Sequence, residues 1–218
     1  MRKFLKKVLS PILQKGFKIY TLKPRTFTYE SITVVVHPEV FSPRFTISTK
    51  LLLDFIKPLN LENKTILELG CGSGIIALYA ASKGADVTAS DINPIATNAL
   101  RVASIKNNLN LTVIDSDLFN TIPNQQFDYI IINPPYYPNN PKNIKESAWY
   151  CGENYEYFNK LFQQLNKTLA KNTIMILSED CNIEYIKSLA FDKNLKLVTL
   201  VAKTILKERN FIFNIELY

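Results

Sequence analysis

The segment Asn133-Pro134-Pro135-Tyr136 follows an apolar run at residues 127–132 and joins an amide, two proline rings and a phenol. If Asn133 Oδ1 and the Pro134 carbonyl each accept one N–H of a planar amide or amino group, they favour a more tetrahedral nitrogen with a directed lone pair. Pro134 and Pro135 stiffen the loop, and Tyr136 can stack on a flat group. The segment predicts a site that positions a weakly nucleophilic nitrogen without a general base. A rigid turn after a strand is the structural alternative.

A glycine-rich turn, Gly70-Cys71-Gly72-Ser73-Gly74, separates an expected strand from an expected helix. Its glycines permit a tight turn and a close approach of a ligand to bare backbone. Ile75 stands where a dinucleotide fingerprint places its third glycine, which disfavours a pyrophosphate ligand. Glu68 adds a negative charge that repels a diphosphate and attracts a cation. A glycine turn without a ligand is the alternative, and Cys71 is expected to be a small filler, since an apolar setting does not lower a thiol pKa.

Two further acids follow the next two expected strands. Asp91 lies 17 residues after Gly74, where a carboxylate can accept both hydroxyls of a ribose. It can equally cap the helix that begins at Pro94. Asp117 is placed to accept a hydrogen bond from an adenine amino group, and a purely structural role is the equal alternative. The Asp91 position would suit any adenosine-containing cofactor, and three acids at three successive strand ends are much harder to explain by structural roles than any one of them alone.

Helix and strand patterns alternate from residue 46 onward, and this alternation predicts a doubly wound α/β fold. Several expected strands are continuously apolar, as in parallel sheets with helices on both faces. Helices are expected at 46–57, 74–83, 94–107, 155–170 and 182–191, and strands at 65–69, 85–90, 111–115, 127–132 and 173–178. Residues 195–203 and 211–218, joined by a polar turn at 207–210, are expected to form an antiparallel hairpin at the sheet edge. Ligands of such sheets bind beyond the carboxyl ends of the strands, where the motifs above lie.

The N-terminal region differs from the rest of the chain. Residues 1–45 are expected to form a helix and strand extension, with strands near 17–22 and 26–38 and a hairpin turn at Glu30 and Ser31, ahead of a main domain at 46–218. The net charge of +7 is uneven, because the first 29 residues hold eight Lys or Arg and no acid. A basic arm of this kind is typical of contact with phosphate backbones. The equal alternative is that the segment forms a solvated amphipathic helix, whose apolar face would contain Phe4, Leu5, Val8, Leu9, Ile12 and Leu13.

Composition excludes several classes of protein. With 47% hydrophobic and 21% charged residues, no apolar run approaches the roughly 20 residues that span a bilayer. The basic start contains no signal-like apolar stretch, so we expect a cytoplasmic protein with no membrane partner. The pattern of cysteine and histidine residues lacks metal-ligand spacing, and the number of cysteines is odd. We therefore expect no metal site and no disulfides among Cys71, Cys151, Cys181 and the single histidine, His37.

As a set, ELGCGSG, SDIN, DLF and NPPY resemble class I S-adenosylmethionine-dependent methyltransferases of the NPPY group, over about residues 32–180. The resemblance implies a Rossmann-like, mostly parallel seven-stranded sheet and S-adenosylmethionine as the cofactor. It implies that Glu68, Gly70 and Gly72 surround the methionine part, that Asp91 contacts the ribose and Asp117 the adenine, and that residues 133–136 hold the target nitrogen. The expected cofactor site also includes Cys71, Gly74, Ile92, Leu118 and Asn133. A sulfonium cation suits a pocket of carboxylates.

Two branches of this group compete for the acceptor. VVVHPEVFS followed by LLLDFI resembles ribosomal RNA guanine-N2 methyltransferases, and the basic N-terminus fits an RNA partner. SAWYCGENYEYFNKLF, and Pro43-Arg44, resemble the release-factor glutamine methyltransferases. The lack of a duplicated methyltransferase domain departs from the first branch, and the short, strand-like N-terminus departs from the second. We favour a glutamine side chain of a translation protein over an RNA base (guanine N2 or adenine N6 of rRNA or tRNA).

Two rival classes have less support. A dehydrogenase would use the same glycine loop for a nicotinamide cofactor, but Ile75 and the NPPY segment disfavour it. A non-catalytic methyltransferase-like RNA-binding factor would be expected to have a damaged glycine loop or a replaced Asn133, and the sequence has neither. The aromatic residues Tyr137, Trp149, Tyr150 and Tyr155 are expected to form a substrate-facing loop, with some of them in the core.

Overall fold

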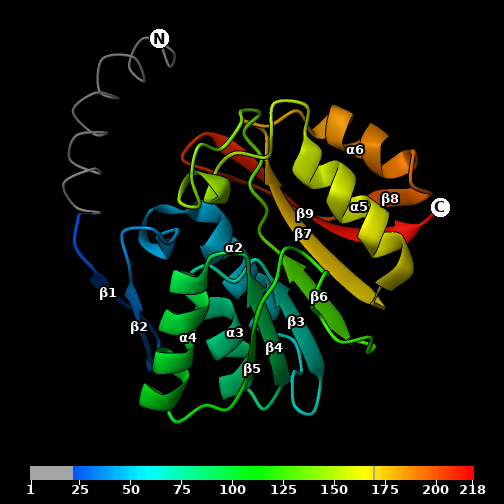
Figure 1. Cartoon of the computed structure of the whole chain (residues 1–218). Coiled ribbons are helices and arrows are strands. Elements are labelled where there is room, and N and C mark those ends of the chain that lie inside the picture. Colours follow the sequence, from blue (N-terminus) through cyan, green and yellow to red (C-terminus); the bar gives the residue numbers. More distant parts are fainter. Residues whose placement is uncertain (1–21, 169) are drawn as a thin grey trace.

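The computed structural model describes residues 22–168 and 170–218 (Figure 1). An antiparallel hairpin comes first, formed by β1 (Arg25–Tyr29) and β2 (Ile32–Val36), and its turn lies at Glu30 and Ser31 as expected. The helix predicted near the N-terminus and most of the strand predicted at 17–22 lie outside the described residues.

From residue 46 onward, helices and strands alternate as predicted. Each element expected between residues 46 and 191 is found within two residues of its predicted bounds. The elements are η1 (Pro43–Phe45), α2 (Ile47–Ile56), β3 (Thr65–Leu69), α3 (Ile75–Ser82), β4 (Asp86–Asp91), α4 (Pro94–Lys106), β5 (Thr112–Asp115), β6 (Tyr129–Ile132), η2 (Glu146–Ala148), α5 (Glu156–Thr168), β7 (Asn172–Ser178), α6 (Ile183–Phe191), β8 (Leu195–Ile205) and β9 (Glu208–Leu217).

The main sheet has seven strands in the order β5-β4-β3-β6-β7-β9-β8. Strands β3 to β7 are parallel to one another, and β9 is antiparallel to both β7 and β8. This confirms the predicted mostly parallel, doubly wound fold. The chain builds outward from β3 to β5 and then returns to the other side of β3 with β6, so the loops after β3 and β6 diverge. Parallel sheets bind ligands at such a switch point.

The C-terminal hairpin forms at the sheet edge as predicted, but its turn is shorter than expected. Leu206 and Lys207 make the turn, both with positive φ (50° and 66°), and β9 already begins at Glu208. A two-residue turn with two left-handed residues matches the twist of paired strands. The expected turn at 207–210 is therefore wrong. Three of these four residues, Glu208, Arg209 and Asn210, pair with β8 and belong to β9.

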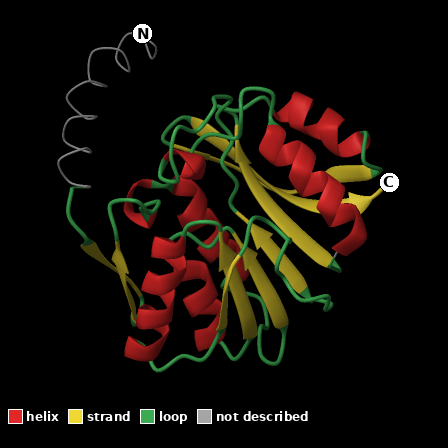
Figure 2. Cartoon of the chain, in the orientation of Figure 1, coloured by secondary structure: helices red, strands yellow, loops and turns green. Residues whose placement is uncertain are grey.

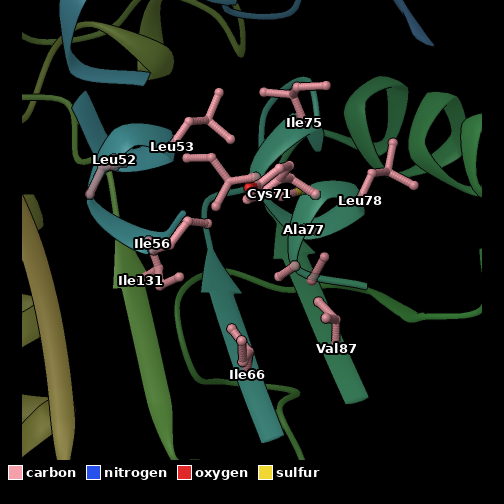
Figure 3. Packing of buried hydrophobic residues seen from close by; sticks show 14 of the residues in the cluster. Leu52, Leu53, Ile56, Ile66, Cys71, Ile75, Ala77, Leu78, Val87 and Ile131 are labelled. Atoms are coloured by element: carbon pink, nitrogen blue, oxygen red, sulfur yellow. The ribbon is translucent and has the colours of Figure 1, made fainter. Parts of the chain in front are cut away.

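Helices cover both faces of the sheet, and each face has its own hydrophobic core (Figure 2). Alternate residues of one strand point to opposite faces, so Ile66 and Ile131 join the cluster with α2, α3 and α4, whereas Leu67 and Ile130 join the cluster with α5 and α6. Figure 3 shows part of the first cluster, in which Leu53 and Ile56 of α2 and Ile75 of α3 belong to the same apolar packing as Cys71.

The β1–β2 hairpin attaches to the first of these clusters. Ile32, Val34 and Val36 of β2 are buried and belong to that core. At the hairpin's edge the Asn107 side chain, just after α4, accepts a hydrogen bond from Thr33 N (2.9 Å) and donates one to Thr33 O (2.8 Å). Within residues 22–168 and 170–218, every helix is too short or too polar to cross a membrane.

Candidate active site

A cavity of about 440 Å³ lies beyond the carboxyl ends of the central parallel strands, and this volume falls within the range of about 300–1,000 Å³ typical of small-molecule sites. The four motifs singled out in the sequence meet there. The structure brings together nearly all of the predicted site residues, since the lining includes Glu68, Gly70, Cys71, Gly72, Asp91, Ile92, Asp117, Leu118, Asn133, Pro134, Pro135 and Tyr136.

The glycine loop is tied to the neighbouring strand. The backbone N–H groups of Gly70 and Cys71 both donate to the Ser90 carbonyl at 2.8 Å. Gly70 and Gly72 have φ values of 76° and 50°, a left-handed conformation that favours glycine. A Cβ atom added at Gly70 would meet no atom within 4 Å, so this backbone is open to a ligand.

Gly74 has a different role from the one predicted. It is absent from the cavity lining, and a Cβ atom added there would lie 2.4 Å from Leu100 Cδ1. Gly74 also has a positive φ of 71° and forms the N-cap of α3. The structure therefore places this glycine at the contact between α3 and α4 rather than at the cavity.

Glu68 is buried, with 5% of its surface exposed, and its Oε2 atom accepts a hydrogen bond from the Ala77 N–H at 2.7 Å. Burial raises the pKa of Glu68 to about 8, the hydrogen bond from Ala77 opposes this rise, and the negative charge of Asp91 adds to it. The carboxyl group is therefore largely protonated at neutral pH. The sequence suggested a negative charge at this position, whereas desolvation penalises the charged form and so raises the pKa.

Asp91 holds the glycine loop in place. Its Oδ2 atom accepts a hydrogen bond from Gly72 N (2.7 Å), and its Oδ1 atom accepts one from Asn93 N (2.8 Å). The N-cap of α4 is Asn93, whose side chain accepts from Ile95 N at 3.0 Å, so the alternative that Asp91 caps this helix is wrong. Burial raises the pKa of Asp91, and these backbone hydrogen bonds lower it.

Asp117 and its neighbours form the third part of the cavity wall. The Asp117 carboxylate is half-exposed and makes an ion pair with Lys160 of α5. Leu118 is buried in a left-handed conformation (φ 53°), and its carbonyl accepts a hydrogen bond from Ser116 Oγ at 2.7 Å. Ile92, beside Asp91, is 48% exposed along the cavity rim.

Asn133 follows the fully buried end of β6 and is half-buried at the cavity. No group in the described part of the chain makes a hydrogen bond to its side-chain amide. Pro134 is buried and the following segment is fixed, since Tyr137 N donates to Trp149 O (3.1 Å) and Cys151 N donates to Tyr137 O (3.0 Å). The amide is thus free to bind a ligand from a rigid corner.

The Tyr136 ring forms part of the cavity wall and also packs against the core beneath α5 and α6. It lies 4.9 Å from the Tyr137 ring, and burial raises the pKa of its phenol. Of the aromatic residues expected in a substrate-facing loop, Tyr137, Trp149 and Tyr150 line the cavity. Tyr155 instead contacts Tyr185 of α6, at a centroid distance of 4.9 Å.

Sequence reasoning missed two aromatic residues of the cavity. Phe41, from the segment between β2 and α2, contacts Trp149 with ring centroids 4.6 Å apart. Tyr157 enters from the first turn of α5, and burial, followed by the charges of Asp91 and Asp117, raises the pKa of its phenol. Both residues lie outside the four site motifs but inside the two stretches that resemble the two branches of the group, and a single aromatic residue in a loop or a helix carries no signal of its own.

The cysteines and the histidine have no place in the proposed chemistry. Cys71 lies among the aliphatic side chains of the core (Figure 3), and burial raises its thiol pKa well above the usual value. Cys151 and Cys181 are also buried, free thiols. His37 does not line the cavity. Across residues 22–168 and 170–218, no three His, Cys, Asp or Glu side chains are grouped so that they could hold a metal ion.

Comparison with known proteins relates the chain to two kinds of methyltransferase. A Methanocaldococcus jannaschii protein with the provisional name protein N5-glutamine methyltransferase is 38% identical over 110 residues, covering 50% of this chain and 53% of that protein. The ribosomal RNA small subunit methyltransferase C of Haemophilus ducreyi is 34% identical over 127 residues, covering 57% of this chain and 36% of the relative. The chain thus matches about half of the first relative's length and about a third of the second's.

Solved structures share the fold at lower identity. The E. cuniculi Mtq2–Trm112 complex, described as responsible for methylation of the eRF1 translation termination factor, has a TM-score of 0.62 at 19% identity, covering 83% of this chain and 99% of that chain. The T. thermophilus 16S rRNA N2 methyltransferase RsmC, in complex with AdoMet and guanosine, has a TM-score of 0.60 at 17% identity, covering 88% of this chain and 50% of that one.

A family model gives the decisive match. The model of the methyltransferase small domain aligns with residues 31–204, which include β2, the cavity and all four sequence motifs. Because this match covers most of the chain, the protein belongs to the methyltransferase small domain family.

Proposed function

We propose that this protein is an S-adenosylmethionine-dependent N-methyltransferase that acts on a planar amide or amino nitrogen. The observation that carries the proposal is the Asn133 amide, which has no hydrogen-bond partner in the described part of the chain and lines the same cavity as the glycine loop. A free amide on a rigid corner is suited to bind an external N–H group.

The cavity residues fit the cofactor. Asp91 would hold the ribose, Asp117 the adenine amino group, and Gly70 to Gly72 with Glu68 the methionine part, all of which line one cavity. When bound, S-adenosylmethionine supplies an activated methyl group on a sulfonium cation. Gly70 supports this fit, because a Cβ atom there would meet no atom within 4 Å and its backbone is therefore open to a ligand.

The protein's contribution to the reaction is orientation and electrostatic stabilisation. Asn133 Oδ1 and the Pro134 carbonyl would each accept one N–H of the target, which directs its lone pair into the cavity. Pro134 and Pro135 hold these acceptors rigid, and Tyr136 offers an aromatic face to the flat group. No histidine lines the cavity and the Cys71 thiol has a raised pKa, so the described residues supply neither a neutral general base nor a thiolate nucleophile there.

A glutamine side chain of a translation protein is the acceptor that we favour. Two observations support it. The first is the cavity volume of about 440 Å³, in the lower half of the usual range, because a carboxamide needs less space beside the cofactor than a purine does. The M. jannaschii relative, named for N5-glutamine methylation of protein, is 38% identical to this chain. An acceptor of this kind implies a cytoplasmic enzyme.

An RNA base is the second candidate, and the basic N-terminal segment favours it. Six of the 26 Lys and Arg residues lie in residues 1–21, which contain no acid, so residues 22–218 hold 20 basic and 19 acidic residues. The positive charge of the chain is therefore concentrated in one short segment, which suits a phosphate backbone. The rRNA methyltransferase relative, at 34% identity, agrees with this candidate.

Incubation with tritiated S-adenosylmethionine and a cell extract tests the proposal and separates the two acceptors. Half of the labelled product is treated with ribonuclease and half with protease, and the Asn133→Ala variant measures labelling that does not depend on this corner. We expect protease alone to abolish the macromolecular label. Loss of label with ribonuclease alone would select an RNA base instead. Absence of label above that of the variant would contradict the proposed function.

A further inference from the structure

We propose that Phe41 and Trp149 form an aromatic clasp that binds the positively charged methyl donor in preference to its neutral product. The inference rests on the proposed function and adds two specificity-determining residues to it. Both side chains line the cavity, and their rings meet at a centroid distance of 4.6 Å and an interplanar angle of 61°.

The clasp joins two segments that are anchored separately. On one side, the Glu39 carbonyl accepts a hydrogen bond from the Asn93 side chain at 3.0 Å, which fixes the segment carrying Phe41 to the start of α4. On the other side, the Trp149 carbonyl accepts from Tyr137 N, which fixes Trp149 to the segment that follows Asn133. The ring contact therefore bridges the cofactor side and the acceptor side of the cavity.

Phe41 also lies next to the glycine loop. A Cβ atom added at Gly72 would be 3.9 Å from Phe41 Cβ, an ordinary van der Waals distance. The clasp thus stands beside the part of the cavity assigned to the methionine end of the cofactor, where the sulfonium lies. Rings of tryptophan and phenylalanine attract a cation that approaches within about 6 Å of the face.

The carboxyl groups of the cavity carry less free negative charge than their number suggests. Glu68 is largely protonated at neutral pH, Asp91 accepts backbone N–H bonds on both oxygens, and Asp117 is paired with Lys160. Aromatic faces therefore add attraction for a cation to that of the carboxylates. Transfer of the methyl group leaves a neutral thioether, to which the rings have no such attraction, so the clasp also favours product release.

The test is calorimetric titration of S-adenosylmethionine and S-adenosylhomocysteine into the wild type and the Trp149→Leu and Phe41→Leu variants. Leucine keeps the apolar contact and removes the π face. We expect each substitution to weaken donor binding about 10-fold and product binding no more than about twofold. Trp149→Phe, which keeps a ring, should retain most of the preference, and it remains informative if a leucine variant does not fold. Phe191→Leu is the matched control, since Phe191 is 56% exposed on α6 and does not line the cavity.

Equal losses of donor and product affinity in the leucine variants, or no loss of either, would overturn the clasp while leaving the proposed function intact. A wild-type protein that binds neither ligand would overturn the proposed function itself. Trp149 is the single tryptophan of the chain, so its fluorescence gives an independent readout of ligand at the clasp. We expect emission to change when the donor is added, and an unchanged spectrum under saturating donor would contradict the placement of Trp149.

Discussion

The carboxyl group of Glu68, at the end of β3, caps helix α3 by accepting a hydrogen bond of 2.7 Å from the backbone N–H of Ala77. The N-cap position of α3 is Gly74, which has no side chain to perform this function. Strand β3 thus supplies the capping group that the glycine loop cannot. The same carboxyl group lines the cavity, so the start of α3 and the proposed cofactor site share one titratable side chain.

Glu68→Gln is predicted to remove a pH dependence of folding stability. The pKa of Glu68 is raised from 4.5 to about 8, so its contribution is fully present below pH 4.5 and is lost as the pH rises towards 8. Between pH 5.5 and 8.5 the free energy of unfolding of the wild type should fall by about 3 kcal/mol. The variant should not show this fall, because glutamine accepts the same hydrogen bond without ionising. Urea denaturation at the two pH values measures the difference. Parallel changes in both proteins would show that Glu68 does not carry this dependence.

Gly74→Ala is predicted mainly to lower folding stability, whereas Gly70→Ala is predicted mainly to lower cofactor affinity. Both glycines have positive φ, which costs an alanine about 1–2 kcal/mol. Only Gly74 adds a clash with the buried Leu100, so its variant should lose about 1–3 kcal/mol more in free energy of unfolding. Gly70→Ala should instead weaken cofactor binding, since its new methyl group enters open space at the cavity. Denaturation and calorimetry of both variants give the comparison, and equal stability losses would contradict the Leu100 contact.

Asp91→Ala is predicted to weaken cofactor binding by about 10- to 100-fold, because hydrogen bonds to a charged group contribute about 1.5–3 kcal/mol. The variant loses the proposed ribose contact and the bond that fixes Gly72. Asp115→Ala is the matched control, since Asp115 pairs with Asp91 in the β4–β5 register but does not line the cavity. Calorimetric titration measures both affinities. If Asp91→Ala binds as tightly as the control, Asp91 has no role in cofactor binding.

The order of helices and strands could be predicted because hydrophobic periodicity is a local property of the chain. The position of the cavity could also be predicted, since parallel strands bring their carboxyl ends to one edge and the motifs follow four such ends. Asn133 and Asp91 line the cavity for this reason. The same logic places the C-terminal hairpin at the sheet edge, after the parallel strands.

Properties that depend on tertiary contacts could not be predicted. The pKa of Glu68 depends on burial under α3, and the role of Gly74 depends on Leu100, which lies 26 residues further along the chain. Phe41 reaches the cavity because tertiary packing places the segment after β2 next to Gly72 of the glycine loop. The turn at Leu206 and Lys207 was missed because strand pairing, rather than the polarity of residues 207–210, sets where β9 begins.

The most direct test of the central claim is the Asn133→Ala variant, assayed for methyl transfer to the labelled fraction of the extract and titrated with S-adenosylmethionine. The claim predicts a fall in the rate of about 100-fold or more, because one acceptor that positions the target nitrogen contributes about 3 kcal/mol. Affinity for the cofactor should stay within about threefold of the wild type. A loss of affinity equal to the loss of rate would show that Asn133 holds the cofactor, and an unchanged rate would show that it does not position the nitrogen.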